Sequence, residues 1–443
     1  MNIKTAQPSR RVSDFKELIG NLNLVRQIGR VTDVIGVIIE SRGPGAAMGE
    51  YCVIYPQNGN SPIPCEVVGF RDDKLLLMPF TDMHGISPGC EVHASGKPLS
   101  VMVSEDSIGR VVDGLGNPID GLGRIPNAVP VQVHATPPKP LERRRITEPM
   151  PLGIRAIDGL FTVGKGQRMG VFSGSGVGKS SVIGMIARFT KADVNVIGLI
   201  GERGREVREF IERDLGEEGL SRSVVVVATS DQSPLMRIKG AYLATAIAEY
   251  FRDRGKNVLL MIDSITRFAY AQRELGLATG EPPATRGYPP SLFTMLPKLL
   301  ERSGMSGKGS ITGLYNVLVE ADDMNEPVAD TVRSILDGHI VLSRALAARN
   351  IYPAVDVMQS ISRVMPDVTS EEHLQLSRRF VEVMATHRDA EDLINIGAYV
   401  KDSNPKIDYA ITRIERMNDY IRQGLFEKIE YEDAKRSLKG IFG

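Results

Sequence analysis

Residues 169–189 read MGVFSGSGVGKSSVIGMIARF and contain the strongest local signal of the 443-residue sequence. The apolar run MGVF, predicted as a strand, leads into a glycine-rich loop that ends at Lys179 and Ser180, and a helical run follows. Glycines let successive backbone N–H groups turn inward around a phosphate, and the helix N-terminus adds a favourable dipole. Lys179 supplies a cation for the β- and γ-phosphates, and the Ser180 hydroxyl is a ligand for Mg²⁺. A chance match to a tight glycine turn is the alternative, which the strand–loop–helix context disfavours.

Two acidic residues that follow other apolar strands complete the predicted site. Asp263 ends the run VLLMID, 84 residues beyond Lys179, and Glu202 follows the run NVIGLIG. Strands of an open parallel sheet bring their C-terminal ends to one edge, so both carboxylates are expected beside the phosphate loop. There Asp263 would hold Mg²⁺ directly or through water, Glu202 would orient the attacking water, and Arg203 would lie near the γ-phosphate. The alternatives are a simple cap residue for Asp263 and a solvated charged loop for Glu202.

The composition argues against several classes of protein. The 54 basic and 54 acidic residues cancel to zero, which argues against a surface built throughout to bind nucleic acid. Hydrophobic residues make up 42% of the chain, which is too much for wholesale disorder. The three cysteines form no CxxC pair and the six histidines no HExxH motif. The N-terminus lacks the apolar core of a signal peptide, and no apolar run approaches the ~18 residues of a spanning helix, so we expect a cytoplasmic protein.

The chain divides into segments with different patterns of strand-like and helical runs, and its length suggests roughly three domains. Residues 27–95 contain short β-type runs separated by turns, which predict a small β-barrel or sandwich. Residues 96–365 come to alternate strand-like and helical runs, as in a mostly parallel sheet with helices on both faces. Residues 366–443 lose the strand signals and predict an all-helical domain. Residues 1–26 form a separate N-terminal segment.

Local signals refine this division. Six prolines between residues 130 and 151 predict an extended connection ahead of the α/β sheet. The run AVDVM (354–358) is predicted as a late strand. The run 206–215, EVREFIERDL, is predicted as a helix, and residues 369–372 resemble a capping box that opens another. Apolar residues spaced from Ile407 to Ile421 predict a further helix in the C-terminal domain.

Several longer runs carry a family resemblance. They include PLGIRAIDGLFTVGKGQRMG (151–170), GLIGERGREVREFI (198–211), IDSITRFAYAQRE (262–274) and GSITGLYNVLVEADD (309–323). Together they resemble the hexameric rotary ATPases of the F-type ATP synthase catalytic-subunit kind, over nearly the whole chain from about Gly29. Within that group the sequence is most similar to the flagellar protein-export ATPases of the type III secretion branch.

The resemblance implies a small N-terminal β-barrel, a central RecA-like α/β P-loop ATPase domain and a C-terminal all-helical domain. It also implies a six-fold ring with ATP between neighbouring subunits. Arg363, in the run SISR, matches an arginine finger that reaches the neighbour's γ-phosphate, and Tyr352 matches the residue that packs on adenine. An ordinary core aromatic is the alternative for Tyr352. Asp263 and Glu202 fall on the Walker B and catalytic-glutamate positions, whereas Ser173 replaces a glycine of synthase catalytic subunits, which counts mildly against a synthase.

The predicted site residues fall into three groups by role. The catalytic group is Lys179, Glu202, Arg203 and Arg363. The nucleotide-binding group is Ser173, Gly174, Ser175, Gly176, Val177, Gly178, Lys179, Ser180, Ser181 and Tyr352. The Mg²⁺ ligands are Ser180 and Asp263.

Four functions compete for this site: an export ATPase, a catalytic subunit of a rotary synthase or ion pump, a non-catalytic ring subunit, and a nucleic-acid translocase. Glu202 argues against the non-catalytic subunits, which lack the catalytic glutamate. One chain carries all the catalytic parts, so a homo-oligomer suffices. The few aromatic residues of 27–95 are not interspersed with basic residues, which argues against a nucleic-acid translocase. We therefore expect a Mg-ATP hydrolase of the flagellar type III export apparatus, with an injectisome ATPase as the first alternative and a rotary synthase subunit as the next.

Residues 1–26 carry five basic and two acidic residues and an apolar stripe of Val12, Phe15, Ile19 and Leu22. So short a helix is marginal alone in water, so it is expected to order only against a partner. The resemblance suggests a dimeric, stator-like negative regulator, with anionic membrane lipids as a weaker second contact. A frayed terminus packed on the β-domain is the alternative. The family further implies a central stalk protein, an export gate, chaperones and export substrates, met at the cytoplasmic face of the export apparatus.

Overall fold

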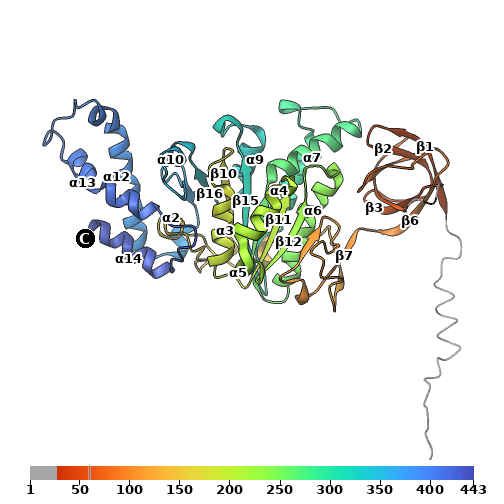
Figure 1. Ribbon diagram of the computed structural model, residues 1–443, viewed down its shortest axis with the longest axis horizontal. Coiled ribbons are helices and arrows are strands. Elements are labelled where there is room, and N and C mark those ends of the chain that lie inside the picture. The colour runs from red at the N-terminus through yellow and green to blue at the C-terminus, as the bar shows by residue number, and fades with distance from the viewer. Residues whose placement is uncertain (1–26, 58, 60) are drawn as a thin grey trace, which may run out of the picture. The chain divides into compact units, whose positions relative to one another are not determined.

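The computed structural model describes residues 27–57, 59 and 61–443 of the chain (Figure 1). These residues form two compact units, the first comprising the described residues up to 79 together with 83–97. The second comprises 80–82 and 98–443. The helix predicted within residues 1–26 lies outside the described residues.

The first unit is a closed barrel with the strand order β1-β2-β5-β4-β3-β6. Its strands are β1 (Ile28–Ile35), β2 (Ile38–Arg42), β3 (Glu50–Tyr55), β4 (Ile63–Arg71), β5 (Lys74–Pro79) and β6 (Glu91–Pro98). Alternate side chains point inward, because successive residues of a strand face opposite sides. Ile39, Ile54 and Leu77 are therefore fully buried, and Cys52 lies opposite Cys65 inside the barrel. The barrel confirms the predicted β-domain and excludes a sandwich.

The second unit is built on a nine-stranded sheet with the order β17-β16-β10-β15-β13-β11-β12-β8, and β14 pairs with β15 beside this path. All the pairings along the main path are parallel except that of β16 with β17. The strands are β8 (Val111–Asp113), β10 (Arg168–Ser173), β11 (Val194–Ile200), β12 (Ser223–Ala228), β13 (Asn257–Asp263), β14 (Gly304–Met305), β15 (Ser310–Leu318), β16 (Gly338–Leu342) and β17 (Ile361–Ser362). Every residue of β11 and β12 is buried, as expected for a parallel sheet covered on both faces.

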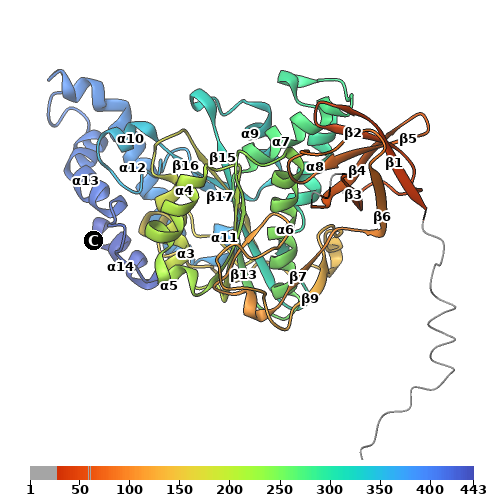
Figure 2. The same cartoon turned by 45° about the vertical axis from the view of Figure 1, so that its right-hand side comes forward.

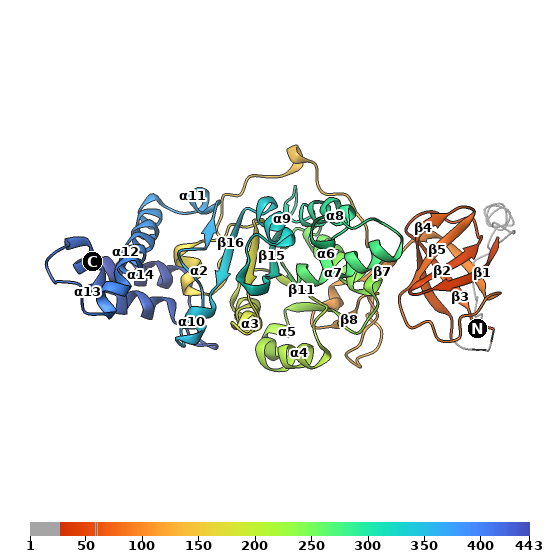
Figure 3. The same ribbon diagram turned by 90° about the horizontal axis from the view of Figure 1, so that it is seen from above.

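Helices cover both faces of this sheet. Figure 3 shows α3, α4 and α5 on one side and α8 and α9 on the other. The helices of this part are α3 (Lys179–Phe189), α4 (Gly204–Glu209), α5 (Gly216–Leu220), α6 (Pro234–Arg252), α7 (Ile265–Ala278), α8 (Pro290–Leu300), α9 (Pro327–Ile335) and α10 (Arg344–Ala348). Strands β7 (Ser100–Val103) and β9 (Val129–Gln132) pair separately, and the proline-rich connection follows β9.

The C-terminal part is all-helical, as predicted (Figure 2). Its main helices are α12 (Glu371–Asn395), α13 (Pro405–Ile421) and α14 (Tyr431–Phe442), preceded by the short α11 (Met365–Val368). They pack around α2 (Arg155–Leu160), which precedes them by more than 200 residues in the sequence, so Phe380 and Met417 join the same buried core as Leu160. The Ser377 hydroxyl donates to the Leu160 carbonyl at 2.9 Å. The helices therefore share one compact unit with the sheet.

Two local predictions were wrong in detail, and a third, the helix at 206–215, is present but differs in its winding. The run AVDVM is not a strand: Val355 makes only an isolated bridge to Leu342, because the Asp356 carboxylate accepts the N–H groups of Met358 and Gln359 and forces a turn. The predicted helix at 206–215 is α4 followed by a π-helical turn over Phe210–Leu215. The cap of α12 is one residue later than predicted, since the Ser370 hydroxyl accepts from the N–H of His373. Among the described residues no helix combines the length and apolar character needed to cross a bilayer.

Candidate functional site

The glycine-rich loop joins the end of β10 to the start of α3, as the sequence predicts. Gly176 and Gly178 adopt positive φ values of 79° and 87°, which other residues rarely adopt, and Gly178 caps α3. A Cβ at Gly174 would lie 2.6 Å from the Arg344 guanidinium, so a larger residue would displace that side chain. The first N–H groups of α3 have no partner within the helix and therefore face the loop as an anion-binding end.

Lys179 joins the two predicted acids at the C-terminal edge of the sheet. Its Nζ lies 2.6 Å from Asp263 Oδ1 and 3.4 Å from Glu202 Oε1. Asp263 is buried at the end of β13, which pairs with β11, the strand before Glu202. Burial lowers the pKa of Lys179, but the charges of Asp263 and Glu202 outweigh burial and raise it overall. Lys179 is thus a permanent cation held between two carboxyl groups.

Glu202 has the ionisation of a general base. Its pKa is raised to about 7: burial is the largest cause, the charge of Asp263 adds to the increase, and Lys179 opposes it. A hydrogen bond with Glu206 also contributes to the raised pKa of Glu202. Burial raises the pKa of Glu206, but the same hydrogen bond and nearby positive charges outweigh burial and lower that pKa overall. Arg203 points elsewhere: its guanidinium is exposed and lies 3.2 Å from the Glu206 carboxylate. The structure therefore brings Glu202, but not Arg203, against Lys179.

The remaining residues of the loop differ in their exposure. Ser180 is exposed on the first turn of α3, whereas Val177 is buried in the core and anchors the loop. Ser173 is buried at the end of β10, and its hydroxyl has no hydrogen-bond partner in the described part of the chain. A cavity of about 170 Å³ adjoins Ser173 and Gly174.

Tyr352 lies over the same loop. Its ring carbons come within 3.4 Å of the position that a Cβ on Gly178 would occupy. Tyr352 is 42% exposed, which does not fit the alternative of an ordinary core aromatic. The backbone carbonyl of Tyr352 accepts a hydrogen bond from the N–H of Gln423 at 2.9 Å, which ties the residue to the C-terminal helical part.

Arg363 lies at the opposite edge of the sheet from its own phosphate loop. β17 is antiparallel to β16, and Ser362 pairs with Gly338, the first residue of β16. Ser173 pairs instead with Leu342, the last residue of β16. These two positions are separated by roughly 13 Å along the strand. The exposed Arg363 therefore lies at the end of the sheet opposite to its own phosphate loop.

Arg267 is a second cation at the site, which the sequence analysis missed. Its Cβ lies 2.6 Å from the ideal Cβ position of Gly201, immediately before Glu202. The Nε of Arg267 is buried without a hydrogen-bond partner in the described part of the chain. The signal was its place four residues after Asp263, which puts Arg267 in the first turn of α7, directly after the strand that ends at Asp263.

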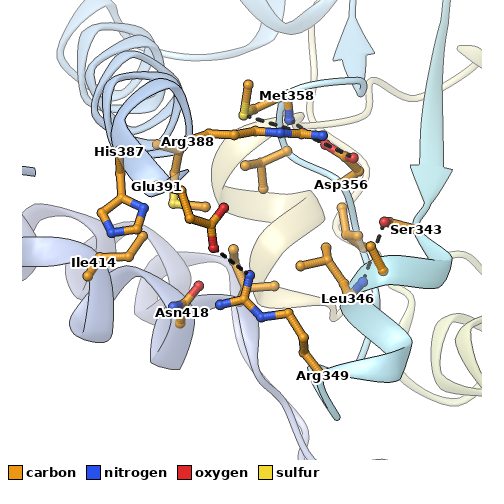
Figure 4. A pocket seen from close by; sticks show the side chains of 15 residues that line it. Ser343, Leu346, Arg349, Asp356, Met358, His387, Arg388, Glu391, Ile414 and Asn418 are labelled. Carbon is orange, nitrogen blue, oxygen red and sulfur yellow. Dashed lines mark hydrogen bonds and ion pairs between the residues drawn. The ribbon is translucent and has the colours of Figure 1, made fainter. Parts of the chain in front are cut away.

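A second cavity, of about 160 Å³, separates the nucleotide-binding part from α12 and α13 (Figure 4). Two ion pairs span it: Arg349 lies 3.3 Å from Glu391, and Arg388 lies 4.0 Å from Asp356. Arg349 and Asp356 flank the segment that carries Tyr352, whereas their partners belong to α12. The ion pairs therefore connect the Tyr352 segment to the helical part.

Three family models match the chain. Residues 31–96 match the beta-barrel domain and residues 153–362 the nucleotide-binding domain of the ATP synthase alpha/beta family. Residues 369–440 match the T3SS EscN ATPase C-terminal domain. The order of these matches follows the barrel, the sheet and the C-terminal helices.

Individual relatives agree with these models over nearly the whole chain. The "Flagellum-specific ATP synthase" of Bacillus subtilis is 54% identical, with 94% of this chain and 96% of that protein covered. The "Type 3 secretion system ATPase" of Xanthomonas euvesicatoria is 50% identical, with 96% of each covered. The assembled ATPase EscN of the enteropathogenic E. coli type III secretion system has a TM-score of 0.89 and 44% identity, with 94% of this chain and all of that chain covered. EscN in complex with its central stalk EscO gives a TM-score of 0.87.

Fold, phosphate loop and relatives agree along the length of the molecule. The chain belongs to the ATP synthase alpha/beta family, in the branch of the flagellar and type III secretion ATPases, and is a nucleotide-binding ATPase.

Proposed function

We propose that this protein hydrolyses Mg-ATP in the flagellar type III export apparatus, at sites shared between neighbouring subunits of a homohexameric ring. The observation that carries the proposal is the division of the catalytic groups between two edges of one sheet. Lys179, Asp263 and Glu202 meet at the edge where β10 ends, and Arg363 lies at the other. A complete site therefore needs two chains.

The Mg²⁺ ligands proposed are Ser180 and Asp263. Their hydroxyl and carboxylate oxygens are of the kind Mg²⁺ prefers, and Mg²⁺ typically takes its other ligands from phosphates and water. Across residues 27–57, 59 and 61–443, no cluster of three or more His, Cys, Asp or Glu could hold a metal unaided, which fits an ion that arrives with the nucleotide. When bound, Mg²⁺ neutralises charge on the β- and γ-phosphates.

The protein groups take the remaining roles. Lys179 exchanges its carboxylate partners for the β- and γ-phosphates, which frees Glu202 to orient the attacking water. Arg363 of one subunit neutralises charge on the neighbour's γ-phosphoryl group as it transfers. Tyr352 packs on adenine. Arg203 can reach the γ-phosphate only if its ion pair with Glu206 breaks. Arg267, which lies beside Gly201, is proposed as a further cation for the phosphates.

The pH dependence of hydrolysis is predicted from the pKa of Glu202. Glu202 must be ionised to orient and accept a proton from water, and its pKa is about 7. We expect kcat/KM, which reports the free enzyme, to rise about tenfold between pH 6 and pH 8. Glu206→Gln replaces a carboxylate by an amide donor, which favours ionised Glu202 and moves the midpoint to lower pH. A flat profile across this range would contradict the role given to Glu202.

The flagellar assignment is supported by the relatives, since the 54% identical protein is named for the flagellum and the 50% identical one for type III secretion. An injectisome ATPase is therefore the second candidate. Affinity purification of the full-length protein from its own cells discriminates between them. We expect flagellar export components to co-purify; recovery of needle and translocator components instead would overturn the flagellar assignment.

A central stalk protein is a further proposed partner, because the EscN ATPase, which is similar to this chain, is known both as an assembly and in complex with its central stalk EscO. An export gate, chaperones and export substrates are further proposed partners, at the cytoplasmic face of the apparatus. No nucleic-acid partner is proposed.

The N-terminal segment is proposed to bind a dimeric, stator-like regulator, with anionic lipids as a weaker contact. We expect deletion of residues 2–22 to leave ATP binding unchanged and to abolish co-purification with the regulator. Phe15→Asp with Ile19→Asp should reproduce the deletion, because it destroys the apolar face alone. Lys4→Ala with Arg10→Ala is the matched control, since it removes charge and spares that face. Unchanged regulator affinity in the truncated protein would favour a frayed terminus.

A further inference from the structure

Arg363 is held at the N-terminal edge of the sheet by three hydrogen-bonded residues, Gln167, Asp337 and Ser362, which are called the platform below. The Gln167 side chain is fully buried, and its Nε2 donates to the Asp337 carbonyl at 3.1 Å and to the Ser362 hydroxyl at 3.0 Å. The N–H of Arg363 donates to the same Asp337 carbonyl at 3.0 Å. One amide group thus holds both the residue before Arg363 and the carbonyl to which Arg363 is bonded.

The platform leaves β17 little freedom to shift. The Ser362 hydroxyl donates to the Thr162 carbonyl at 2.9 Å, in addition to its contact with Gln167. A Cβ on Gly338 would lie 2.4 Å from the Ile361 carbonyl oxygen, so β17 packs directly on the backbone of β16. A substitution that removes the hydrogen bonds of Gln167 or Ser362 is therefore expected to shift the position of Arg363.

Asp337 is in turn fixed by Arg168. The Arg168 guanidinium pairs with both carboxylate oxygens of Asp337, each at 3.1 Å, and the Arg168 N–H adds a third bond of 3.1 Å. Arg168 is the first residue of β10, and Ser173, its last residue, opens the phosphate loop. About 17 Å of one strand therefore joins the support of Arg363 to the chain's own nucleotide site.

We propose that Gln167 and Ser362 are positioning residues for Arg363, which hold it in register for the γ-phosphate of the neighbouring subunit. Through β10 the same support links two successive nucleotide sites of the ring. The proposal rests on the shared-site function above. Its physical basis is that charge stabilisation depends steeply on geometry, since a displacement of about 1 Å costs on the order of a hundredfold in rate.

Two substitutions of different severity test this role. Gln167→Leu removes the whole amide, and Ser362→Ala removes only one hydroxyl and its bonds to Gln167 and Thr162. We expect kcat to fall between about tenfold and a hundredfold, with KM for ATP changed less than about twofold. The matched control is Ser310→Ala, a fully buried serine at the same edge of the sheet whose hydroxyl bonds Asn257 instead. It should keep the wild-type kcat.

Mixing experiments assign each defect to the finger or to the loop. A variant whose Arg363 is misplaced but whose phosphate loop is intact should regain activity when it is mixed with Lys179→Ala protein, because the Lys179→Ala subunits supply a correctly placed Arg363. The same variant should gain no activity from Arg363→Ala protein, because neither protein in that mixture has a correctly placed Arg363. Protein with a damaged loop shows the reverse pattern.

We expect Gln167→Leu and Ser362→Ala to be rescued by Lys179→Ala and not by Arg363→Ala. Rescue by Arg363→Ala, rescue by neither partner, or a near-normal kcat in both single variants would overturn the positioning role. The mixture of Arg363→Ala with Lys179→Ala is run alongside. If that mixture fails while mixed rings form, the shared-site function fails; if it succeeds and the platform variants are not rescued, only the positioning role fails.

Discussion

Lys179→Ala is expected to abolish ATP turnover, with kcat reduced by about a thousandfold, and to weaken ATP binding. The substitution removes the only cation that contacts both Asp263 and Glu202 in the described structure. The two carboxyl groups then face the incoming phosphates without the cation that pairs with both of them, so the variant is expected to lose ATP binding as well as catalysis. Phosphate release measures the turnover, and calorimetric titration with a non-hydrolysable ATP analogue measures the binding.

Lys191→Ala is the matched control for this prediction. Lys191 lies just beyond the C-terminal end of α3, and its exposed ammonium pairs with Glu430 at 2.8 Å rather than with the site. We expect normal turnover in this variant. Substantial turnover by folded Lys179→Ala protein would show that the loop is not the phosphate site.

Glu202→Gln is expected to separate binding from catalysis. Glutamine keeps the shape of the side chain and its capacity for hydrogen bonds, but it cannot carry the negative charge that orients water and receives its proton. We expect kcat to fall by about a hundredfold to a thousandfold while the Kd for ATP stays within about threefold of the wild type.

Glu209→Gln controls for the loss of a carboxylate on the same segment. Its side chain pairs with Arg205 at 2.8 Å on the exposed face of α4, away from Lys179. Near-normal turnover in Glu202→Gln protein would transfer the water-orienting role to another residue, and Glu206 is then the next candidate, because it shares a hydrogen bond with Glu202.

The phosphate loop and its two acids could be predicted because each stands at the end of an apolar strand. Parallel strands bring such ends together whatever the details of packing, so Asp263 and Glu202 meet Lys179 as expected. Arg267 could not be predicted in this way. It lies on a helix, where its approach to the site depends on the space that Gly201 leaves.

Other features depend on contacts between residues far apart in the sequence. The run AVDVM has the apolar alternation of a strand, but the Asp356 side chain captures the N–H groups that a neighbouring strand would need. The C-terminal helices carry a clear helical period, yet nothing in that period shows that they pack around α2 and share its core. The position of Arg363 likewise follows from the antiparallel pairing of a two-residue strand, too short to predict.

A mixture of Arg363→Ala and Lys179→Ala proteins tests the shared site most directly. Each protein alone should be nearly inactive, one for want of a finger and the other for want of a phosphate cation. In mixed rings some interfaces pair the intact Lys179 of one subunit with the intact Arg363 of its neighbour, so ATP hydrolysis should return and peak near equal amounts. No recovery of hydrolysis, with mixed rings demonstrated by co-purification of differently tagged subunits, would contradict a site shared between two chains.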